Sequence, residues 1–579
     1  MLKINNLSYS FPQKDLYEEI SFSLEKGQHC AFIGVSGSGK STLTDFIMDP
    51  EKYMFTGDLE IEEASRIGYV SQFSQIKNTK ELTVFQFLAE KYIDLQEKLQ
   101  DIAKEMETSS EIETLLEEYQ ETSDALEAIG GDDFESKINK TLNLAELIDH
   151  KDLMISELSG GEFKLVQVIK EMLTLPDLMI MDEPDVFLDF ENLNSLKDLI
   201  NSYKGTLLVI THNRYLLNHC FNKIIHLENM QLQEFDGRYI DYNFSLLESK
   251  IELQELAHID NEEIKRNEAL IKKFRFAAEQ NPEARIGQHV NSRVKIQERL
   301  IARRVKEPFV FIKEPDMSFT TDNELQEDIA LKVEDYSVAF DDVLLEDVSF
   351  EIASKDKAVI IGQNGTGKST LLRDLFKNKN EAIKFGEGVE VAYLSQLQGE
   401  MLDESNTVKQ ELFDAGFKTS EEILLCLSRY GLEESIANQK ISSLSGGEKN
   451  ILQIIKISIS QANMLLLDEP TSHLDTYSQI ALERALDDYN GAILMVSHDF
   501  YTIVNSMDYV LIIEDKSIRK MKLKKFKQMI YKRHFDKDYL EIELEIKTLE
   551  NKIEMALKNN DFELAKVLSQ ELEVLIKSF

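Results

Sequence analysis

The sequence predicts an α/β protein in which one domain type occurs twice along the chain and is joined and extended by helical segments. At 579 residues, the chain is long enough for about three or four domains. Several short motifs occur in the same order in both halves, and the downstream ones lie 286 residues apart in the two copies, which indicates an internal repeat. Short apolar runs precede two of the motifs in each copy, as is typical of buried parallel strands.

The motifs divide the chain into four predicted parts. Residues 1–243 form the first copy and residues 329–520 the second. Between them, residues 244–328 form a basic helical linker, and residues 521–579 form a basic segment with a helical extension. The first copy is longer by 38 residues between Gln72 and Leu158, which predicts a helical arm inserted at about 88–140.

A glycine-rich loop opens each copy, directly after the apolar runs 30–33 and 358–361. In such a strand–loop–helix setting, backbone amides close around phosphates and the lysine reaches the β- and γ-phosphate oxygens. The serine after the lysine offers its hydroxyl to Mg²⁺. The sequence therefore predicts two nucleoside triphosphate sites. Their loop residues are Gly34, Val35, Ser36, Gly37, Ser38, Gly39, Lys40, Ser41 and Thr42 in the first copy, and Gly362, Gln363, Asn364, Gly365, Thr366, Gly367, Lys368, Ser369 and Thr370 in the second.

An Asp-Glu pair ends an apolar strand in each copy, Asp182-Glu183 in the first and Asp468-Glu469 in the second. The carboxyl ends of parallel strands meet at one edge of a sheet, where ligands bind. We expect each aspartate to belong to the magnesium shell and each glutamate to orient and deprotonate an attacking water. This arrangement predicts nucleotide hydrolysis at both sites.

Two further residue pairs are expected near the phosphates. His212 and His498 each follow the strand aspartate by 30 residues, and we expect them to contact the γ-phosphate. An isolated histidine after a strand is more often a polar cap, but the repeated spacing favours a catalytic contact. Gln72 and Gln396 occupy matching positions and are predicted to complete the magnesium sites with Ser41 and Ser369.

A Leu-Ser-Gly-Gly-Glu motif at residues 158–162 and again at 444–448 completes a set that resembles the ATP-binding cassettes of the ABC superfamily. In that family, this helix start binds the γ-phosphate held by the opposite cassette, and free amides at a helix N-terminus suit an anion. The resemblance implies ATP and Mg²⁺ as cofactors and two composite sites formed head to tail. One site would join Lys40 and Asp182 to Ser445, Gly446 and Gly447, and the other Lys368 and Asp468 to Ser159, Gly160 and Gly161.

The copies also carry matching aromatics and one difference. Phe11 and Phe340 precede the phosphate loops and are candidates to stack on adenine, with ordinary core phenylalanines as the alternative. After the Asp-Glu strand, the second copy has the usual family pattern Thr-Ser-His-Leu-Asp at 471–475, whereas the first has Asp-Val-Phe-Leu-Asp at 185–189. In the family this loop communicates between the sites, so the difference puts their equivalence in question.

The charge is strongly acidic overall, at −40, but unevenly distributed. Residues 92–137 hold fifteen acids and three lysines, whereas residues 265–306 hold twelve Lys or Arg and four Glu, and residues 516–535 hold nine Lys or Arg and no acid. Single charge runs are usually solvated helix faces. Basic islands on an acidic chain nevertheless favour a polyanionic partner, because the rest of the surface repels one.

Three scattered cysteines, with no CxxC pair, argue against a disulfide framework or a zinc site and favour a reducing compartment. No apolar run approaches the length of a membrane span. The first residues lack the layout of a secretory signal. Together these features lead us to expect a cytoplasmic protein without a membrane domain.

The linker is predicted to be a helical hairpin with its tip around residues 277–292, because Asn281-Pro282 and Gly287 interrupt a charged helical pattern. The C-terminal extension is predicted to be a coiled-coil hairpin. Its apolar stripes are Ile542, Ile546, Leu549 and Ile553, then Leu564, Leu568, Leu572 and Leu575 after an Asn559-Asn560-Asp561 turn.

The linker, the arm position and the tandem cassettes together resemble the ABC-F family, whose members act on ribosomes. That resemblance implies a cytosolic ATPase that binds near the ribosomal exit site, acts on translation through its linker and is released by ATP hydrolysis. Its partners would be rRNA, the peptidyl-site tRNA and large-subunit proteins, and the cassettes would pair within a monomer. A basic hairpin suits entry among RNA phosphates. The candidate RNA contacts are Lys272, Lys273, Arg275, Arg285, Arg293, Lys295 and Arg299.

Three alternatives stay open from the sequence. A tip slightly longer than the compact linker of housekeeping members also occurs in members that protect ribosomes from antibiotics. The ATPase subunit of an ABC transporter would use the same cassettes, but it would need a coupling surface for membrane domains. A DNA-repair or chromosome ATPase would typically add zinc-binding cysteines or much longer coiled coils, and this chain has neither.

Overall fold

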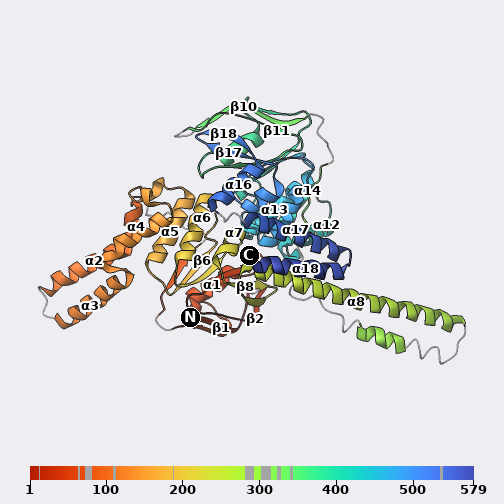
Figure 1. Ribbon diagram of the computed structural model, residues 1–579, viewed down its shortest axis with the longest axis horizontal. Coiled ribbons are helices and arrows are strands. Elements are labelled where there is room, and N and C mark those ends of the chain that lie inside the picture. The colour runs from red at the N-terminus through yellow and green to blue at the C-terminus, as the bar shows by residue number, and fades with distance from the viewer. Residues whose placement is uncertain are drawn as a thin grey trace. The chain divides into compact units, whose positions relative to one another are not determined.

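The computed structural model of the chain describes residues 1–11, 14–62, 65–71, 81–107, 112–186, 188–280, 292–300, 315–321, 328–339, 343–534 and 539–578 (Figure 1). These residues form two compact units. One consists of Met1–Asp236 with Glu314–Met529, and the other of Gly237–Lys313 with Ile530–Phe579. The first unit contains both predicted nucleotide-binding copies, here called the first and second cassettes.

The first cassette is built on a six-stranded sheet in the order β5-β6-β7-β3-β8-β9. The first five strands are parallel and β9 is antiparallel to β8. A second, antiparallel sheet has the order β2-β1-β4. The strands are β1 (Leu2–Phe11), β2 (Lys14–Leu24), β3 (His29–Gly34), β4 (Thr56–Ile61), β5 (Ile67–Val70), β6 (Leu178–Asp182), β7 (Thr206–Ile210), β8 (Lys223–Glu228) and β9 (Gln231–Asp236); the helices are α1 (Lys40–Met48), α5 (Gly160–Leu173), α6 (Phe190–Ser202) and α7 (Arg214–Cys220).

The second cassette repeats this plan, with sheet orders β14-β15-β16-β12-β17-β18 and β11-β10-β13. Its central strands are buried along their whole length, which explains their continuous apolar sequences. The strands are β10 (Ile329–Ala339), β11 (Val343–Ala353), β12 (Lys357–Ile361), β13 (Ile383–Phe385), β14 (Val391–Leu394), β15 (Met464–Asp468), β16 (Ala492–Val496), β17 (Tyr509–Glu514) and β18 (Ser517–Lys522); the helices are α10 (Lys368–Lys377), α11 (Val408–Asp414), α12 (Ser420–Arg429), α13 (Gly446–Ser460), α14 (Thr476–Asp488), α15 (Phe500–Ser506) and α16 (Leu523–His534).

Helices occupy the insertion of the first cassette: α2 (Val84–Met106), α3 (Ile112–Ile129) and α4 (Phe134–Leu144). Figure 1 shows α2 and α3 running side by side, away from the sheet. A capping box between Thr83 and Gln86 starts α2. Most of α3 is exposed, with only Thr122 and Ile129 buried. The acidic residues of this stretch therefore lie largely on solvent-exposed helix surface.

The second unit is entirely helical in its described part. It contains α8 (Tyr239–Gln280), a helical segment at residues 292–300, α17 (Tyr539–Lys558) and α18 (Phe562–Ser578). Apolar residues of α17 and α18 pack together and onto Ile251 of α8. Of the predicted apolar stripes, Leu564 is an exception, because its side chain is 46% exposed and Ala565 is buried in its place.

The predicted linker tip falls mostly on residues 281–291, outside the described residues. On either side of it, the described parts of the hairpin contact each other. Asn267 Nδ2 of α8 donates to Gln297 Oε1 at 2.7 Å and to the carbonyl of Arg293 at 3.1 Å. Among the described helices, none combines the length and the apolar character that a membrane crossing needs.

Candidate functional site

The two phosphate loops have nearly the same geometry. Each lies between a buried strand and a helix, and each helix is preceded by a glycine in the left-handed region, Gly39 at φ 101° and Gly367 at φ 91°. Lys40 Nζ donates to the carbonyls of Gly34 and Val35 at 2.8 and 2.9 Å, and Lys368 does the same in its own loop. Both ammonium groups curl over their loops, where a β- or γ-phosphate would be held.

The residues predicted to bind magnesium gather at the ends of β6 and β15. Ser369 Oγ donates to Asp468 Oδ1 at 3.0 Å, and Ser41 likewise hydrogen-bonds to Asp182. Burial raises the pKa of both aspartates to about 6. Oxygen ligands of this kind suit Mg²⁺, and a cation would favour the ionised carboxylates. Gln396 is exposed and lines the cavity between the cassettes, whereas Gln72 lies outside the described residues.

Each Leu-Ser-Gly-Gly-Glu motif, here called a signature, begins a helix with its serine as the cap. Ser159 caps α5 and Ser445 caps α13, each in a reciprocal capping box with the glutamate three residues later. The second signature lies against the first phosphate loop. A Cβ added at Gly447 would lie 2.7 Å from Ser36 Oγ and 2.6 Å from the His473 carbonyl, so only glycine fits there.

The other pair of motifs also meets. Gly160 of the first signature and Asn364 of the second phosphate loop line one cavity, together with Glu469 and His498. Asp189, from the loop after β6, accepts a hydrogen bond from the backbone of Asn364. Each site thus draws residues from both cassettes, in the pairing that the sequence predicts.

The two glutamates differ in their surroundings. Glu183 Oε2 lies 3.4 Å from His473 Nδ1 of the second cassette. Burial alone would raise the pKa of Glu183, but this hydrogen bond and the nearby His212 hold the pKa below its ordinary value. Glu469 is buried beside Asp468, and burial followed by this like charge raises its pKa to about 8.

One sequence position contributes to this difference. Phe187 stands where the second cassette has His473, so the first cassette offers no imidazole to Glu469. Phe187 itself lies outside the described residues. The altered loop noted in the sequence therefore coincides with a difference in electrostatics between the two glutamates.

His212 and His498 are buried at the ends of the strands next to the glutamates. Burial lowers the pKa of His212 to about 4 and that of His498 to about 3, so both imidazoles are neutral near neutral pH. Nε2 of His498 lies 3.7 Å from Glu469 Oε1, and this buried atom makes no hydrogen bond to the described residues. In the first loop, Ser38 Oγ is likewise buried without a described partner. These unsatisfied atoms and the left-handed glycines fit a bound triphosphate.

The remaining predicted contacts are peripheral. Phe11 is 44% exposed and makes a T-shaped contact with Tyr9, with ring centroids 5.2 Å apart. Phe340 lies outside the described residues. Of the RNA candidates, Arg285 also lies outside them, and Arg293 is half-buried beside Asn267. The exposed candidates are Lys272, Lys273, Arg275, Lys295 and Arg299.

A family profile described as ABC transporter matches residues 17–186 and 345–472, which together make up more than half of the chain. The chain belongs to the ABC transporter family. Each matched stretch contains one phosphate loop and one Asp-Glu strand, so this member carries two ATP-binding cassettes in tandem.

Several named relatives match most of this chain. Energy-dependent translational throttle protein EttA of Haemophilus influenzae is 26% identical over 86% of this chain and 89% of its own length. ABC transporter F family member 5 of Arabidopsis thaliana is 27% identical over 89% of this chain and 75% of its own length. YfmM, an uncharacterised ABC transporter ATP-binding protein of Bacillus subtilis, is 28% identical over 86% of this chain and 96% of its own. The chain is thus related to ABC-F members over most of its length.

Among solved structures, RNase-L Inhibitor covers 92% of each chain, with a TM-score of 0.55 and 17% identity. The archaeal ribosome recycling factor aABCE1, solved with the stalk protein aP1, covers 91% of this chain and 92% of its own, with a TM-score of 0.54 and 16% identity. At these identities the likeness shows the fold alone.

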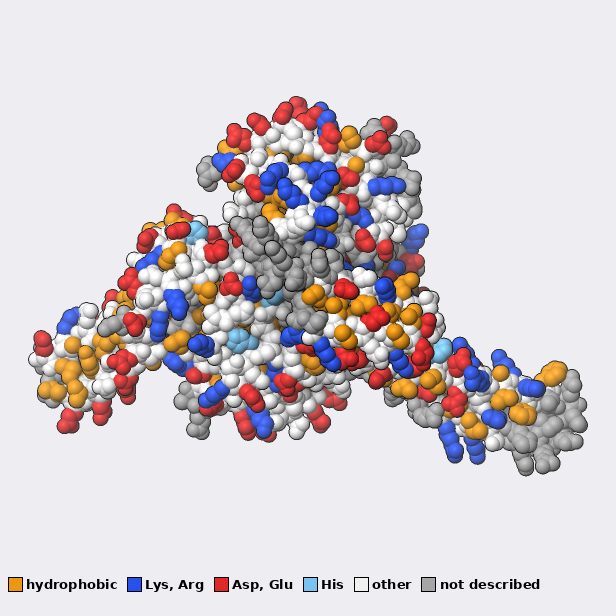
Figure 2. Space-filling view, viewed as in Figure 1, with side chains coloured by type: hydrophobic (Ala, Val, Ile, Leu, Met, Phe, Trp, Pro, Cys, Tyr) orange, Lys and Arg blue, Asp and Glu red, His pale blue; other side chains and the backbone are white. Residues whose placement is uncertain are grey.

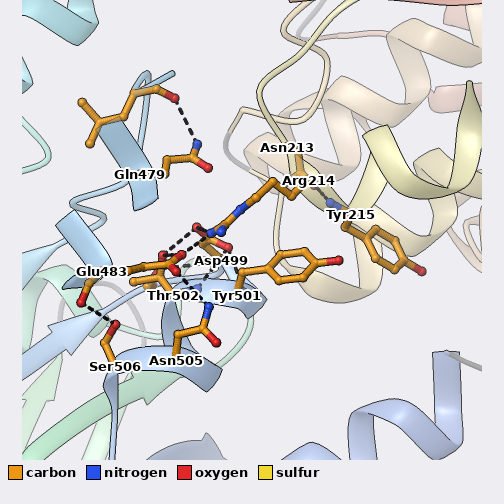
Figure 3. Close-up of polar contacts among 12 residues, drawn as sticks. Asn213, Arg214, Tyr215, Gln479, Glu483, Asp499, Tyr501, Thr502, Asn505 and Ser506 are labelled. Carbon is orange, nitrogen blue, oxygen red and sulfur yellow. Dashed lines mark hydrogen bonds and ion pairs between the residues drawn. The ribbon is translucent and has the colours of Figure 1, made fainter. Parts of the chain in front are cut away.

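A buried ionic cluster joins the two cassettes and was not expected from the sequence (Figure 3). Arg214, two residues after His212, reaches from α7 to the carboxylates of Glu483 and Asp499, the latter at 3.4 Å. Its guanidinium also lies over the Tyr501 ring, 4.7 Å from the centroid. The side chains of Arg214 and Glu483 are only 11% and 7% exposed.

The repeat does not reproduce this cluster at the matching positions. Asp499 directly follows His498 and caps α15, and the matching position in the first cassette is Asn213, which caps α7. The residue that matches Arg214 is Phe500. A single arginine therefore ties the segment after His212 to the segment after His498.

Replacing Arg214 with Met should impair closure of the cassettes. Removing one partner leaves Glu483 and Asp499 buried without a counter-ion, which costs about 3–5 kcal/mol. We expect ATP-dependent closure, followed by a cysteine cross-link or fluorescence pair across the cassettes, to need much more ATP than in the parent. Adding Glu483→Gln and Asp499→Asn should restore part of it. Unchanged closure in the Arg214→Met variant would contradict a coupling role for this arginine.

The two sites should also differ in their response to pH. In a Glu183→Gln variant, hydrolysis depends on Glu469, whose raised pKa leaves it protonated below about 8, so activity should rise as pH increases through that value. In a Glu469→Gln variant, hydrolysis depends on Glu183, whose lowered pKa keeps it ionised, so activity should stay level over that range. ATPase rates measured across pH check this.

The matched control replaces His473 with Phe, the residue of the first cassette. Added to Glu469→Gln, it should shift the activity profile towards higher pH, because Glu183 loses the hydrogen bond that lowers its pKa. Identical pH profiles for the two single Glu→Gln variants would show that the loop difference affects packing only.

Proposed function

We propose that this chain is a cytoplasmic ATPase of the ABC-F type that acts on the ribosome, with ATP hydrolysis driving its release. The observation that carries the proposal is the combination, on one chain, of two composite ATP sites and a helical linker hairpin with exposed basic residues. EttA, which is similar to this chain over most of both lengths, is named for an energy-dependent throttle on translation.

Hydrolysis would use the same residues in both sites. Glu183 and Glu469 would each hold the attacking water and take its proton, while the neutral His212 and His498 would contact the γ-phosphate. Lys40 and Lys368 would move from their loop carbonyls onto the β- and γ-phosphate oxygens. Bound Mg²⁺ would neutralise charge on the phosphates, held by the strand aspartates and the loop serines. The signature helix of the opposite cassette would close each site.

The linker would provide the contact with RNA. The exposed basic residues near the end of α8 and on the segment 292–300 lie on the two described sides of one hairpin, and Asn267 and Gln297 hold those sides in register. Protection of the ribosome from antibiotics would use the same cassettes and linker. The tip residues that would separate the two activities lie at 281–291, so the general role in translation is the one proposed.

Replacing both Glu183 and Glu469 with Gln should separate ATP binding from hydrolysis. The substitution keeps size and hydrogen bonding but removes the base, so turnover should fall by about 10²–10⁴ while ATP still binds. The cassettes should then stay closed, and the variant should remain on ribosomes and block protein synthesis. Phosphate release, nucleotide binding and in vitro translation measure these effects. Hydrolysis near the parental rate would refute the catalytic assignment.

Changing Arg293, Lys295 and Arg299 to Gln should weaken ribosome binding. Each lost contact with a single-strand-like phosphate reduces the slope of log K against log salt by about 0.7, so we expect the slope to flatten by about 2 units. ATPase activity without ribosomes should barely change. A variant with Lys377, Lys379 and Lys418 changed to Gln, three exposed residues of the second cassette, carries the same charge change and is the control. Equal slopes in the two variants would contradict the role of the linker.

A further inference from the structure

An edge strand of the second cassette carries a run of exposed lysines. Lys520 and Lys522 lie on β18, the outermost strand of its sheet, and Lys524 and Lys525 follow at the start of α16. We call these four residues the β18–α16 lysines. Figure 2 shows lysine and arginine side chains gathered where Figure 1 labels β17 and β18.

The β18–α16 lysines are not used to hold the fold together. Within the part of the chain that the structure describes, none of the four pairs with a carboxylate, whereas the neighbouring Arg519 pairs with Glu514 at 3.1 Å. Lys520 Nζ lies 3.5 Å from the centroid of the Tyr509 ring, a cation–π contact that fixes the stem of this lysine. The positive charge of this surface is therefore left for a partner.

The side chains at alternate positions of a strand share one face. Lys520 and Lys522 are two residues apart, so their Cα atoms are about 7 Å apart along β18. They stand opposite Leu511 and Tyr509 of β17. Because β18 runs directly into α16, the strand lysines are followed without a gap by those of the helix. The result is a continuous basic strip.

The first cassette shows that the fold does not require this charge. At the repeat spacing of 286 residues, Glu234 matches Lys520 and Asp236 matches Lys522. Both acids lie on β9, the equivalent edge strand, in the equivalent register. There, Lys223 at the position of Tyr509 forms ion pairs with both, with Nζ 2.6 Å from Glu234 and 3.7 Å from Asp236. The same hairpin thus carries ion-paired acids in one copy and lysines without a carboxylate partner among the described residues in the other.

The chemistry of the strip favours a phosphate backbone. On a chain of net charge −40, such a surface attracts a polyanion locally while the rest repels it. Stable binding to a membrane surface would need an apolar face as well. Of the apolar residues interleaved with the lysines, Met521 and Phe526 are buried, at 6% and 4% exposed, and Leu523 is partly buried. Lysine, as a point charge on a flexible stem, binds phosphates without reading bases.

We propose that the β18–α16 lysines are a second RNA-binding surface, separate from the linker, which holds phosphates of the RNA backbone without regard to sequence. The choice of RNA among nucleic acids rests on the proposed function at the ribosome. The linker would then act on the ribosome while this strip anchors the second cassette to it.

The test uses the full chain with Glu183→Gln and Glu469→Gln, in ATP, binding to purified ribosomes at several salt concentrations. One variant changes all four lysines to Gln. A second carries Lys520→Glu and Lys522→Asp, the residues of the first cassette, which this strand position tolerates there. The control changes Lys377, Lys379, Lys418 and Lys440 to Gln, four exposed lysines elsewhere in the second cassette. Melting temperature and ribosome-free ATP binding check the fold.

The four-lysine variant should flatten the salt slope by up to about 3 units, at about 0.7 for each phosphate contact, while the control keeps the parental slope. The charge-reversed variant should bind more weakly than the parent. A four-lysine variant that binds with the control's slope overturns the proposal and leaves the ribosome function standing.

Parallel binding measurements use protein-free ribosomal RNA and phosphatidylserine vesicles. They test the RNA-binding role of the four lysines separately from the proposed function at the ribosome. If the parent binds no ribosomes, the proposed function fails, and the strip is then judged on free RNA. If the four-lysine variant loses binding to free RNA and the control variant keeps it, the result supports the β18–α16 lysines as an RNA-binding surface. Binding to vesicles but not to RNA, lost in the same variant, overturns it in favour of a membrane.

Discussion

The hydrogen bond between Glu183 and His473 connects a catalytic candidate of one cassette with a loop of the other, at 3.4 Å. It exists only when the signature helix of the second cassette lies against the first phosphate loop, because Gly447 and His473 belong to the same contact. The hydrogen bond that lowers the pKa of Glu183 therefore depends on this closure.

The same contact makes the two halves unequal. Glu183 meets the imidazole of His473, whereas the matching position in the sequence of the first cassette is a phenylalanine, so the repeat is symmetric in fold and asymmetric in electrostatics. Arg214 follows the same pattern, since it crosses to the second cassette from a position that holds Phe500 in the other copy. Such paired differences favour two sites that hydrolyse ATP one after the other over two sites that act independently.

The sequence predicted the fold class and the tandem cassettes, because glycine spacing and buried strand patterns are local and were present twice. It predicted the arm because the first copy alone is longer, by 38 residues, between Gln72 and Leu158. It also pointed to the loop at 185–189 as unusual. It could not identify the Arg214 cluster, since Arg214 lies 269 positions from Glu483 and 285 from Asp499, and neither Glu483 nor Tyr501 belongs to a motif. Nor did the apolar stripes of α17 and α18 name α8 as their partner, because periodicity shows that a helix buries one side but not against what.

The helix α8 has 42 residues, which corresponds to about 63 Å. Near its start it packs against the C-terminal hairpin through Ile251 and through the ion pair of Glu255 with Lys566, at 2.7 Å. Farther along, the described segment 292–300 contacts it through Asn267. In mechanical terms it is a cantilever clamped at the root, whose deflection under load grows steeply with the length left free. The C-terminal hairpin therefore sets the stiffness of the linker, and shortening or loosening that clamp would soften the lever without altering a single residue at its far end.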